Sequence, residues 1–380
     1  MQKKSYREAV FMFAVPILTV IIICSILELF SWLYVKYISI PTTAFEFRMK
    51  QPEPYHNAKY FSEDFVKESF LQPGGWDISP KTGDITPHDF NGKFFHIRNG
   101  RRVTAFNPEK HENTVFLFGG STVYNSEVPD EYTVASQLQL LFNKFHPEKY
   151  IVQNFGITSF TTTQQLRMLK TVTEFRPGDI VIFYDGVNEI FLNIFYANPQ
   201  SSMVKVAQRN LDTLSWLLKM MNKLAEISCF ARLFLNPVDY GLPEHLGDEV
   251  FTQQMAELAQ QEFTRNIIEA HKYSTEKGAR FFHFLQPNFY SDDKYTKYEK
   301  TIKKNKYIMP GGVEESFKKG QPYLRKATAE FAESTNSFDL TGIFDGHAEG
   351  DEYFFDSVHV NHTANRVIAE NIFNVIRNSE

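Results

Sequence analysis

The segment TVFLFGGST, residues 114–122, decides how this chain folds. Residues 114–118 are typical of a strand buried on both faces, and the two glycines that follow allow a sharp turn. The turn presents Ser121 at the carboxyl end of the strand, which is the edge where parallel α/β sheets bind their ligands. Similar apolar runs occur at 150–154, 179–184 and 279–285, with a weaker one at 337–344.

Stretches with helical spacing of apolar residues lie between these runs. They are residues 134–145, 162–175, 249–277 and 363–376. Buried runs that alternate with helices indicate a parallel sheet between two helix layers. We therefore predict an α/β fold, a three-layer α/β/α sandwich with a central parallel sheet.

The composition excludes several classes of protein. The 380 residues carry a formal charge of −5 and are 43% hydrophobic, which describes a packed globular chain. A mildly acidic chain lacks the clustered basic residues that a nucleic-acid partner requires, so no nucleic acid is expected. Cys24 and Cys229 are too few for a disulfide framework or a cysteine-based zinc site.

The N-terminal segment is long and apolar enough to cross a membrane. Residues 9–27 carry no charge, and after Glu28 the apolar run continues over residues 29–35, enough to span about 30 Å as a helix. Three basic residues precede it and only Lys36 follows closely, which places the N-terminus in the cytoplasm. We predict a cytoplasmic segment 1–8 and a single-pass signal anchor 9–35 in the inner (plasma) membrane, with the remainder on the periplasmic or extracytoplasmic side.

Three other interpretations of this segment are weaker. A cleaved signal peptide has a shorter apolar region and a small-residue cleavage site, which is missing here. A lipoprotein site at Cys24 lacks the small residue expected just before it. A buried core helix of a soluble protein is disfavoured because so many apolar residues are hard to cover.

The rest of the chain divides by composition. Residues 36–112 are rich in proline, glycine and aromatics and are expected to form a linker and an extension with short strands, one of them just before the Asn99-Gly100 turn. Residues 113–380 are expected to form the main domain, which carries the predicted strands and is interrupted by an insertion at about 189–250. Helical spacing at 204–234 within the insertion fits a lid or substrate platform and equally fits extra structural helices.

Polar residues follow the predicted strands in an order that suggests one site. Ser121 follows the first strand, Gly156 ends the second and Asn188 follows the third. Near the C-terminus, Asp356 precedes His359 by three residues. At that spacing the carboxylate reaches the imidazole within one turn and orients it as a base for a serine nucleophile.

In this order the motifs resemble the sequence blocks of the SGNH (GDSL-like) hydrolase superfamily. The likeness covers roughly residues 114–376 and implies a flavodoxin-like fold, Ser121 as nucleophile, and His359 with Asp356 as its partners. It also implies an oxyanion hole made by the N–H groups of Ser121 and Gly156 and by the Asn188 amide. Gly120 stands where the family more often has aspartate, and Glu189 replaces the usual aspartate after Asn188.

A narrower likeness bears on the substrate. The Gly-Gly-Ser-Thr form, Gln286-Pro287 after the fourth strand and the N-terminal anchor resemble a bacterial subset associated with cell-envelope polysaccharides. We therefore expect a serine esterase that removes acyl groups, most simply acetyl, from an envelope glycan. No cofactor and no metal are expected, because His362, which could suggest a metal ligand beside His359, has no matching carboxylate or cysteine spacing.

Several alternatives stay open at this stage. The same triad serves an O-acyltransferase, which could receive acyl groups from a multi-spanning membrane acyltransferase partner. A lipase or thioesterase, or a non-catalytic glycan-binding or assembly subunit, is also compatible. Asn188 competes with a helix N-cap role, and Asp185 and Glu189 are expected at the rim of the cleft.

Overall fold

The computed structural model describes most of the chain outside the insertion. The described residues are 6–37, 48–49, 53–55, 58–71, 75–79, 82, 84–172, 174–190, 220, 224, 228, 230, 253–292, 294–305, 308–309 and 312–379. The chain forms two compact units, one of Met1–Thr42 with Ala207–Gly241 and one of Thr43–Val206 with Leu242–Glu380. The predicted insertion at 189–250, with its helical stretch 204–234, lies almost wholly outside the described residues.

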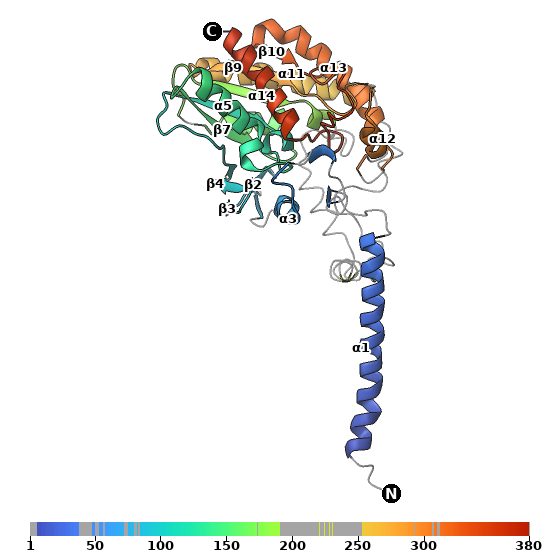
Figure 1. Ribbon diagram of the computed structural model, residues 1–380. Helices are drawn as coiled ribbons and strands as arrows, with labels where there is room; N and C mark the ends of the chain where they lie inside the picture. The colour runs from blue at the N-terminus through green and yellow to red at the C-terminus, as the bar shows by residue number, and fades with distance from the viewer. Residues whose placement is uncertain are drawn as a thin grey trace. The chain divides into compact units, whose positions relative to one another are not determined.

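The first unit contains one long apolar helix. Helix α1, Tyr6–Tyr37, has 32 residues and includes Pro16 (Figure 1). Its segment Phe13–Leu33 has a mean hydropathy of 2.5 and most of its side chains are exposed, so by length and composition it could cross a membrane. The hydroxyls of Thr19 and Ser25 donate to carbonyls four residues earlier, which satisfies them in an apolar environment. The predicted segment 9–35 falls within this helix.

The second unit is built on the predicted parallel sheet. Its strands are β6 (Asn113–Gly119), β7 (Tyr150–Gly156), β8 (Ile180–Asp185), β9 (Arg280–Leu285) and β10 (Ser337–Asp339). All pair in parallel, in the spatial order β10-β9-β8-β6-β7. Numbered along the chain this order is 2-1-3-4-5, the flavodoxin-like arrangement. The predicted fold class is confirmed.

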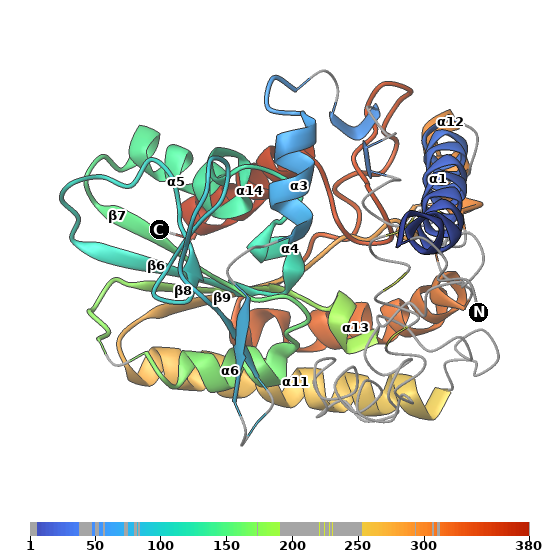
Figure 2. The same ribbon diagram turned by 90° about the horizontal axis from the view of Figure 1, so that it is seen from below.

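Helices cover both faces of the sheet, as Figure 2 shows. Helices α5 (Val134–Phe145) and α14 (His362–Asn378) cover one face. Helices α6 (Thr162–Leu169), α11 (Gln253–Glu276) and α13 (Val313–Thr335) cover the other. Helix α6 ends six residues before the predicted boundary at 175. The sequence analysis missed α13, which contains Gly320 and Pro322, two residues that usually mark a helix end.

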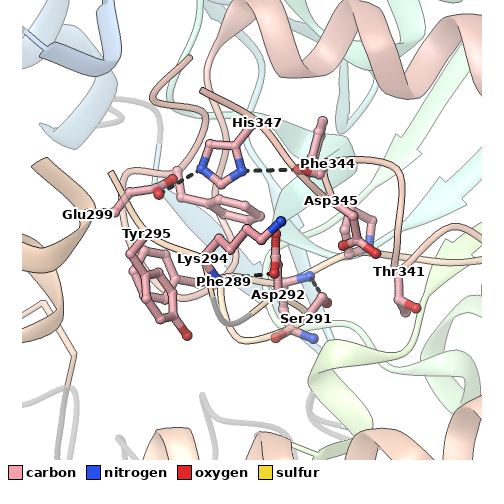
Figure 3. A pocket seen from close by; sticks show the side chains of 13 residues that line it. Phe289, Ser291, Asp292, Lys294, Tyr295, Glu299, Thr341, Phe344, Asp345 and His347 are labelled. Atoms are coloured by element: carbon pink, nitrogen blue, oxygen red, sulfur yellow. Dashed lines mark hydrogen bonds and ion pairs between the residues drawn. The ribbon is translucent and has the colours of Figure 1, made fainter. Parts of the chain in front are cut away.

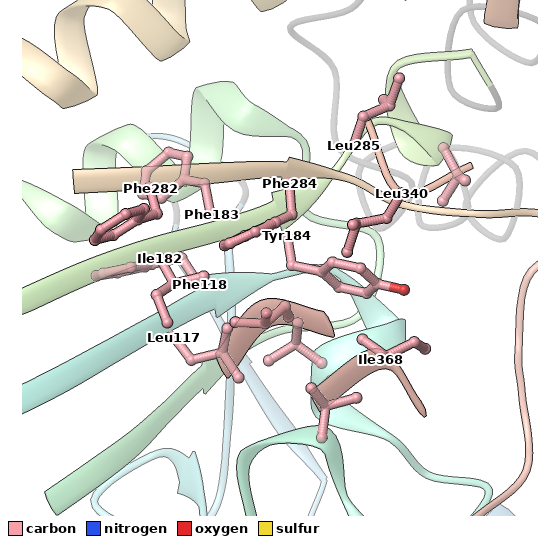
Figure 4. Close-up of a cluster of buried hydrophobic side chains, with 14 of the residues drawn as sticks. Leu117, Phe118, Ile182, Phe183, Tyr184, Phe282, Phe284, Leu285, Leu340 and Ile368 are labelled. Atoms are coloured by element: carbon pink, nitrogen blue, oxygen red, sulfur yellow. The ribbon is translucent and has the colours of Figure 1, made fainter. Parts of the chain in front are cut away.

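Aromatic side chains dominate the core between the layers (Figure 4). Phe118 and Phe183 on neighbouring strands are fully buried, with ring centroids 5.3 Å apart. Full burial of one such side chain contributes about 1.5–3 kcal/mol. Because the strands are held from both faces, their carboxyl ends form a fixed edge, and the polar residues just beyond that edge inherit fixed positions.

The extension before β6 belongs to the same compact unit. It contains α3 (Glu63–Leu71), a hairpin of β1 (Trp76–Ile78) with β2 (Ile85–Pro87), and a three-stranded sheet of β3 (Phe90–Asn91), β4 (His96–Arg98) and β5 (Arg101–Arg102). The predicted turn joins β4 to β5, with Asn99 and Gly100 at φ 52° and 68°.

Arg102 ties this extension to the parallel sheet. Its guanidinium is fully buried and donates to the carbonyls of Tyr124, Asn125 and Val128 and to the Asp130 carboxylate at 2.8 Å. These acceptors lie between Tyr124 and Asp130, just after the predicted nucleophile, so the extension helps to fix this part of the chain.

Candidate active site

Ser121 begins the short helix α4 (Ser121–Tyr124) immediately after β6. The two preceding glycines are required by close packing. A Cβ atom on Gly119 would lie 2.3 Å from Val123 and 2.6 Å from the Tyr184 carbonyl, and one on Gly120 would lie 2.4 Å from Nδ2 of Asn188. The Gly-Gly pair therefore lets the strand end approach its neighbours and leaves Ser121 at the carboxyl edge of the sheet.

His359 and Asp356 meet Ser121 in a continuous chain of hydrogen bonds. Nε2 of His359 lies 2.8 Å from Oγ of Ser121, and Nδ1 lies 2.7 Å from Oδ2 of Asp356. The other oxygen of Asp356 accepts the backbone N–H groups of Val358 and His359, at 2.9 and 2.8 Å. These bonds fix the carboxylate, which in turn fixes the imidazole, as a serine–histidine–aspartate triad requires.

The electrostatics of this pair favour an imidazolium held by a carboxylate. Burial opposes charge on both groups, but the His359 charge and the hydrogen bonds lower the pKa of Asp356 to about 2. Burial also disfavours the charged form of His359, yet the charges of Asp356 and Glu127 raise the pKa of its imidazole to about 9. About a fifth of each side chain remains exposed, 22% for His359 and 23% for Asp356, so the pair is open to solvent and substrate.

Two of the predicted oxyanion donors are the backbone N–H of Ser121 and the side-chain amide of Asn188. Within the described part of the chain, the backbone N–H of Ser121 donates to no other group, as expected for the first residue of a helix. The Asn188 amide follows β8 and donates one hydrogen to the carbonyl of Phe160 at 2.9 Å. That bond orients the amide next to Gly120 and engages it with the neighbouring turn instead of with a helix N-terminus.

Gly156 is placed differently from the prediction. Its backbone N–H donates to Oδ1 of Asn154 at 2.8 Å, and a Cβ atom there would lie 2.4 Å from the backbone nitrogen of Tyr124. The glycine thus allows β7 to pack under α4, and its N–H is already engaged. The turn that approaches Asn188 comes three residues later, where Ser159 has a left-handed φ of 64°. The prediction from sequence chose the strand-end glycine and missed this turn.

Asp185 and Glu189 are buried, which corrects the prediction that they line the rim. Their exposed fractions are 2% and 4%. Burial raises the pKa of Asp185 well above its ordinary range, and burial with the neighbouring Asp185 raises the pKa of Glu189 to about 8. His283 on β9, whose Nε2 lies 3.2 Å from Asp185, has its pKa lowered to about 3 by burial.

This buried cluster supports the site from below. Glu189 accepts the backbone N–H of Thr162 at 2.6 Å, so Asn188 and Glu189 both hold the 160–162 turn. Thr122, next to Ser121, donates to Gln286 at 3.1 Å, and the N–H of Gln286 donates to the Asp185 carbonyl. Ser121 and the Asn188 loop are therefore linked through one network under the sheet edge.

A small closed cleft lies among the loops that follow β9 and β10 (Figure 3). In it His347 bridges the Glu299 carboxylate at 2.8 Å and the Phe344 carbonyl at 3.0 Å. The cleft offers about 10 Å³, which is room for about one water molecule. This cleft is too small to hold an acyl or sugar group.

Comparisons with known proteins gave matches only among solved structures. No protein-family model and no curated protein matches the chain. The matched structures include the esterase EstA from Pseudoalteromonas sp. (13% identity, 98% of that chain covered, TM-score 0.38). They also include a member of the lipolytic protein G-D-S-L family from Veillonella parvula (11%, 99%, 0.38) and an acetylxylan esterase from Geobacillus stearothermophilus (12%, 95%, 0.39). Each of these matches covers 70% of the present chain.

The assignment of the fold rests on the strand order and on the ordered motifs at the strand ends. The class of protein they define is a flavodoxin-like α/β/α domain with serine, histidine and aspartate joined at the carboxyl edge of its sheet. The strand order and this placement of the three residues agree with the fold that the resemblance of the sequence motifs to the SGNH/GDSL-like hydrolases implies.

Proposed function

We propose that the protein is a serine esterase that acts through an acyl-enzyme on acyl esters, most simply acetyl esters, of a cell-envelope glycan. One observation carries the proposal: the unbroken hydrogen-bond chain from Asp356 through His359 to Ser121 at the sheet edge. A serine placed in this way is activated by the adjacent base, and the base is held in one tautomer by the carboxylate.

The proposed reaction has two balanced steps. Oγ of Ser121 attacks the ester carbonyl while Nε2 of His359 takes the hydroxyl proton, and the resulting oxyanion is stabilised by the Ser121 N–H and the Asn188 amide. The C–O bond to the sugar then breaks, and His359 returns the proton to the departing hydroxyl. Water attacks the acyl-serine by the same route, releasing the acid and regenerating Ser121. Asp356 stays ionised throughout.

The glycan substrate and the location are proposed from the sequence. The Gly-Gly-Ser-Thr motif with Gln286-Pro287 resembles envelope-polysaccharide enzymes, and α1 supplies an anchor that would keep the domain at the membrane. Lys3, Lys4 and Arg7 before the apolar segment place the N-terminus inside the cell, with the triad on the extracytoplasmic side of the inner (plasma) membrane. A periplasm-specific reporter fused after Glu380 should be active. A reporter active only in the cytoplasm would reverse this topology.

An O-acyltransferase is the second candidate, because a sugar hydroxyl can replace water in the second step. It would receive its acyl group from a multi-spanning membrane acyltransferase partner, and the anchor would favour that encounter. Exclusion of water from the acyl-enzyme separates the two functions. A non-catalytic glycan-binding or assembly subunit is disfavoured by the complete set of triad contacts.

The test compares where the acyl group goes. Full-length protein in detergent is incubated with p-nitrophenyl acetate, with and without a deacetylated glycan acceptor, and both free acetate and acetylated glycan are measured. Release of free acetate that disappears in Ser121→Ala supports the esterase. Transfer of acetyl groups to the acceptor that disappears in the same variant supports the acyltransferase instead. A folded protein with neither activity contradicts both catalytic functions.

A further inference from the structure

Arg48 is a buried charged residue that no step of the proposed reaction uses. Only 10% of its side chain is exposed, and it lies eleven residues after Tyr37, the last residue of α1. Its Nη1 atom is 3.4 Å from Oε1 of Glu127, whose side chain is 4% exposed. Two buried charges of this kind are costly to desolvate, so their pairing calls for an explanation beyond stability.

The pair joins the two loops that carry the triad. Glu127 lies in the loop that follows α4 and Ser121, and it also accepts a hydrogen bond from the Ser126 hydroxyl at 2.9 Å. The Arg48 guanidinium lies over the ring of Phe355, 5.0 Å from its centroid. Phe355 precedes Asp356, and its N–H donates to the carbonyl of His359 at 2.8 Å. Arg48 therefore contacts the nucleophile's loop and the base's loop at once.

Neighbouring residues of the same segment support the histidine loop further. Asn361, which is fully buried and caps α14, donates to the Pro54 carbonyl at 2.7 Å. The hydroxyl of Tyr60 lies 3.1 Å from Nδ1 of His362, so His362 contacts the extension. The ring of Tyr55 lies 4.8 Å from that of Phe355. The segment that contains Arg48 thus packs against residues 355–362 at several points.

The charged residues around His359 affect the protonation of its imidazole. Among the described residues, Asp356 and Glu127 favour the protonated form of its imidazole, and Arg48 disfavours it. Oε2 of Glu127 is buried and accepts no hydrogen bond within the described part of the chain. Glu127 is therefore a buried second carboxylate that is held at one oxygen by Arg48 and Ser126 and linked through Arg48 and Phe355 to the loop of His359.

We propose that Glu127, held by Arg48, is a positioning residue that stabilises the imidazolium of His359, and that Arg48 makes the segment after α1 a part of the active site. The inference rests on the proposed function, since it assigns these residues a role through His359. Glu127 takes no proton from substrate in this account, and it acts through its charge and through the loop it holds.

The decisive measurement is an NMR titration of His359 in full-length, detergent-solubilised protein with 13C-labelled histidine, its signal assigned with a His359→Gln variant. In Glu127→Gln the titration midpoint of His359 should fall by at least about half a pH unit, because one favourable charge is gone. Adding Arg48→Met to Glu127→Gln should raise the midpoint again, because the unfavourable charge then leaves as well. Opposite shifts of this kind do not arise from general structural damage.

Controls keep folding and function separate. Lys67→Met removes the exposed i,i+4 pair of Lys67 with Glu63 on α3 and should leave the His359 midpoint unchanged. Glu127→Asp, which keeps the charge, should restore most of the wild-type midpoint. An unchanged midpoint in folded Glu127→Gln overturns the inference, whether or not the protein is an esterase. If the wild-type protein has no esterase activity but the predicted shifts of the His359 midpoint occur, the proposed function is contradicted and the charge relationship between Glu127 and His359 is still established.

Discussion

Nε2 of His359 lies 2.8 Å from Oγ of Ser121 although the two residues are 238 positions apart in the chain. The flavodoxin-like strand order brings them together, because Ser121 follows the strand next to the sheet edge and His359 precedes the last helix. Asp356 completes the relationship at 2.7 Å from Nδ1.

Removing the orienting carboxylate should cost most of the activity without unfolding the protein. Asp356→Asn keeps the shape but loses the charge that fixes the histidine tautomer, and kcat should fall about 10⁴-fold. The measurement is steady-state hydrolysis of p-nitrophenyl acetate. The matched control is Asp351→Asn in the same loop region, where the carboxylate of Asp351 accepts the N–H of Ala348. This variant should retain activity. Equal activity in Asp356→Asn and the wild type would be incompatible with a triad.

The reaction should require alkaline conditions for full rate. Only the neutral imidazole can accept the Ser121 proton, and the charges of Asp356 and Glu127 raise the pKa of His359 to about 9 against the opposing effect of burial. Therefore kcat/KM should rise with pH, with a midpoint above the ordinary histidine value of 6.5. A pH–rate profile of the wild type measures this directly. A midpoint at or below 6.5 would show that the carboxylates do not dominate the environment of His359.

The oxyanion site should respond to changes at both Asn188 and Gly120. Asn188→Ala removes one donor and should lower kcat by about 10²–10³-fold with little change in KM. Gly120→Ala places a methyl group 2.4 Å from Nδ2 of Asn188 and should displace the same amide. Kinetics of both variants are compared with Asn371→Ala, which removes an amide that donates to the Val367 carbonyl within α14. A loss seen in KM alone would assign Asn188 to substrate binding.

Glu189 should make folding stability depend on pH. Burial and Asp185 raise its pKa to about 8, above the unfolded value of 4.5, so the folded state holds this proton more tightly. The stability from this group is complete below pH 4.5 and is lost as the pH rises through 8. Glu189→Gln, which has no proton to lose, should gain Tm relative to the wild type between pH 5 and 8. Thermal unfolding of Glu189→Gln and of the wild type at pH 5 and at pH 8 tests this prediction, with a Glu276→Gln variant, at an exposed position, as control. A Tm difference between the two proteins that is the same at both pH values would contradict it.

The sequence predicts most of the sheet and the core of the site because those signals are local. Each strand is a short apolar run, Ser121 follows one of them, and Asp356 and His359 are close enough in sequence to be recognised as a pair. Arg48 and Glu127 gave no such signal, because their pairing spans 79 positions and depends on tertiary packing. Glu189 was misplaced for a related reason, since a charged residue after a strand is usually solvated. Gly156 illustrates a third limit, because the sequence does not reveal that its N–H donates to the side chain of Asn154.

The central claim is that Ser121 is an activated nucleophile, and active-site labelling tests it most directly. Full-length protein in detergent is treated with a fluorophosphonate probe, digested, and examined by mass spectrometry for the modified residue. We predict a single adduct on Ser121 that forms faster as the pH rises and is strongly reduced in His359→Gln. An unlabelled Ser121 in protein shown to be folded by circular dichroism, or labelling that is unaffected by His359→Gln, would contradict the account.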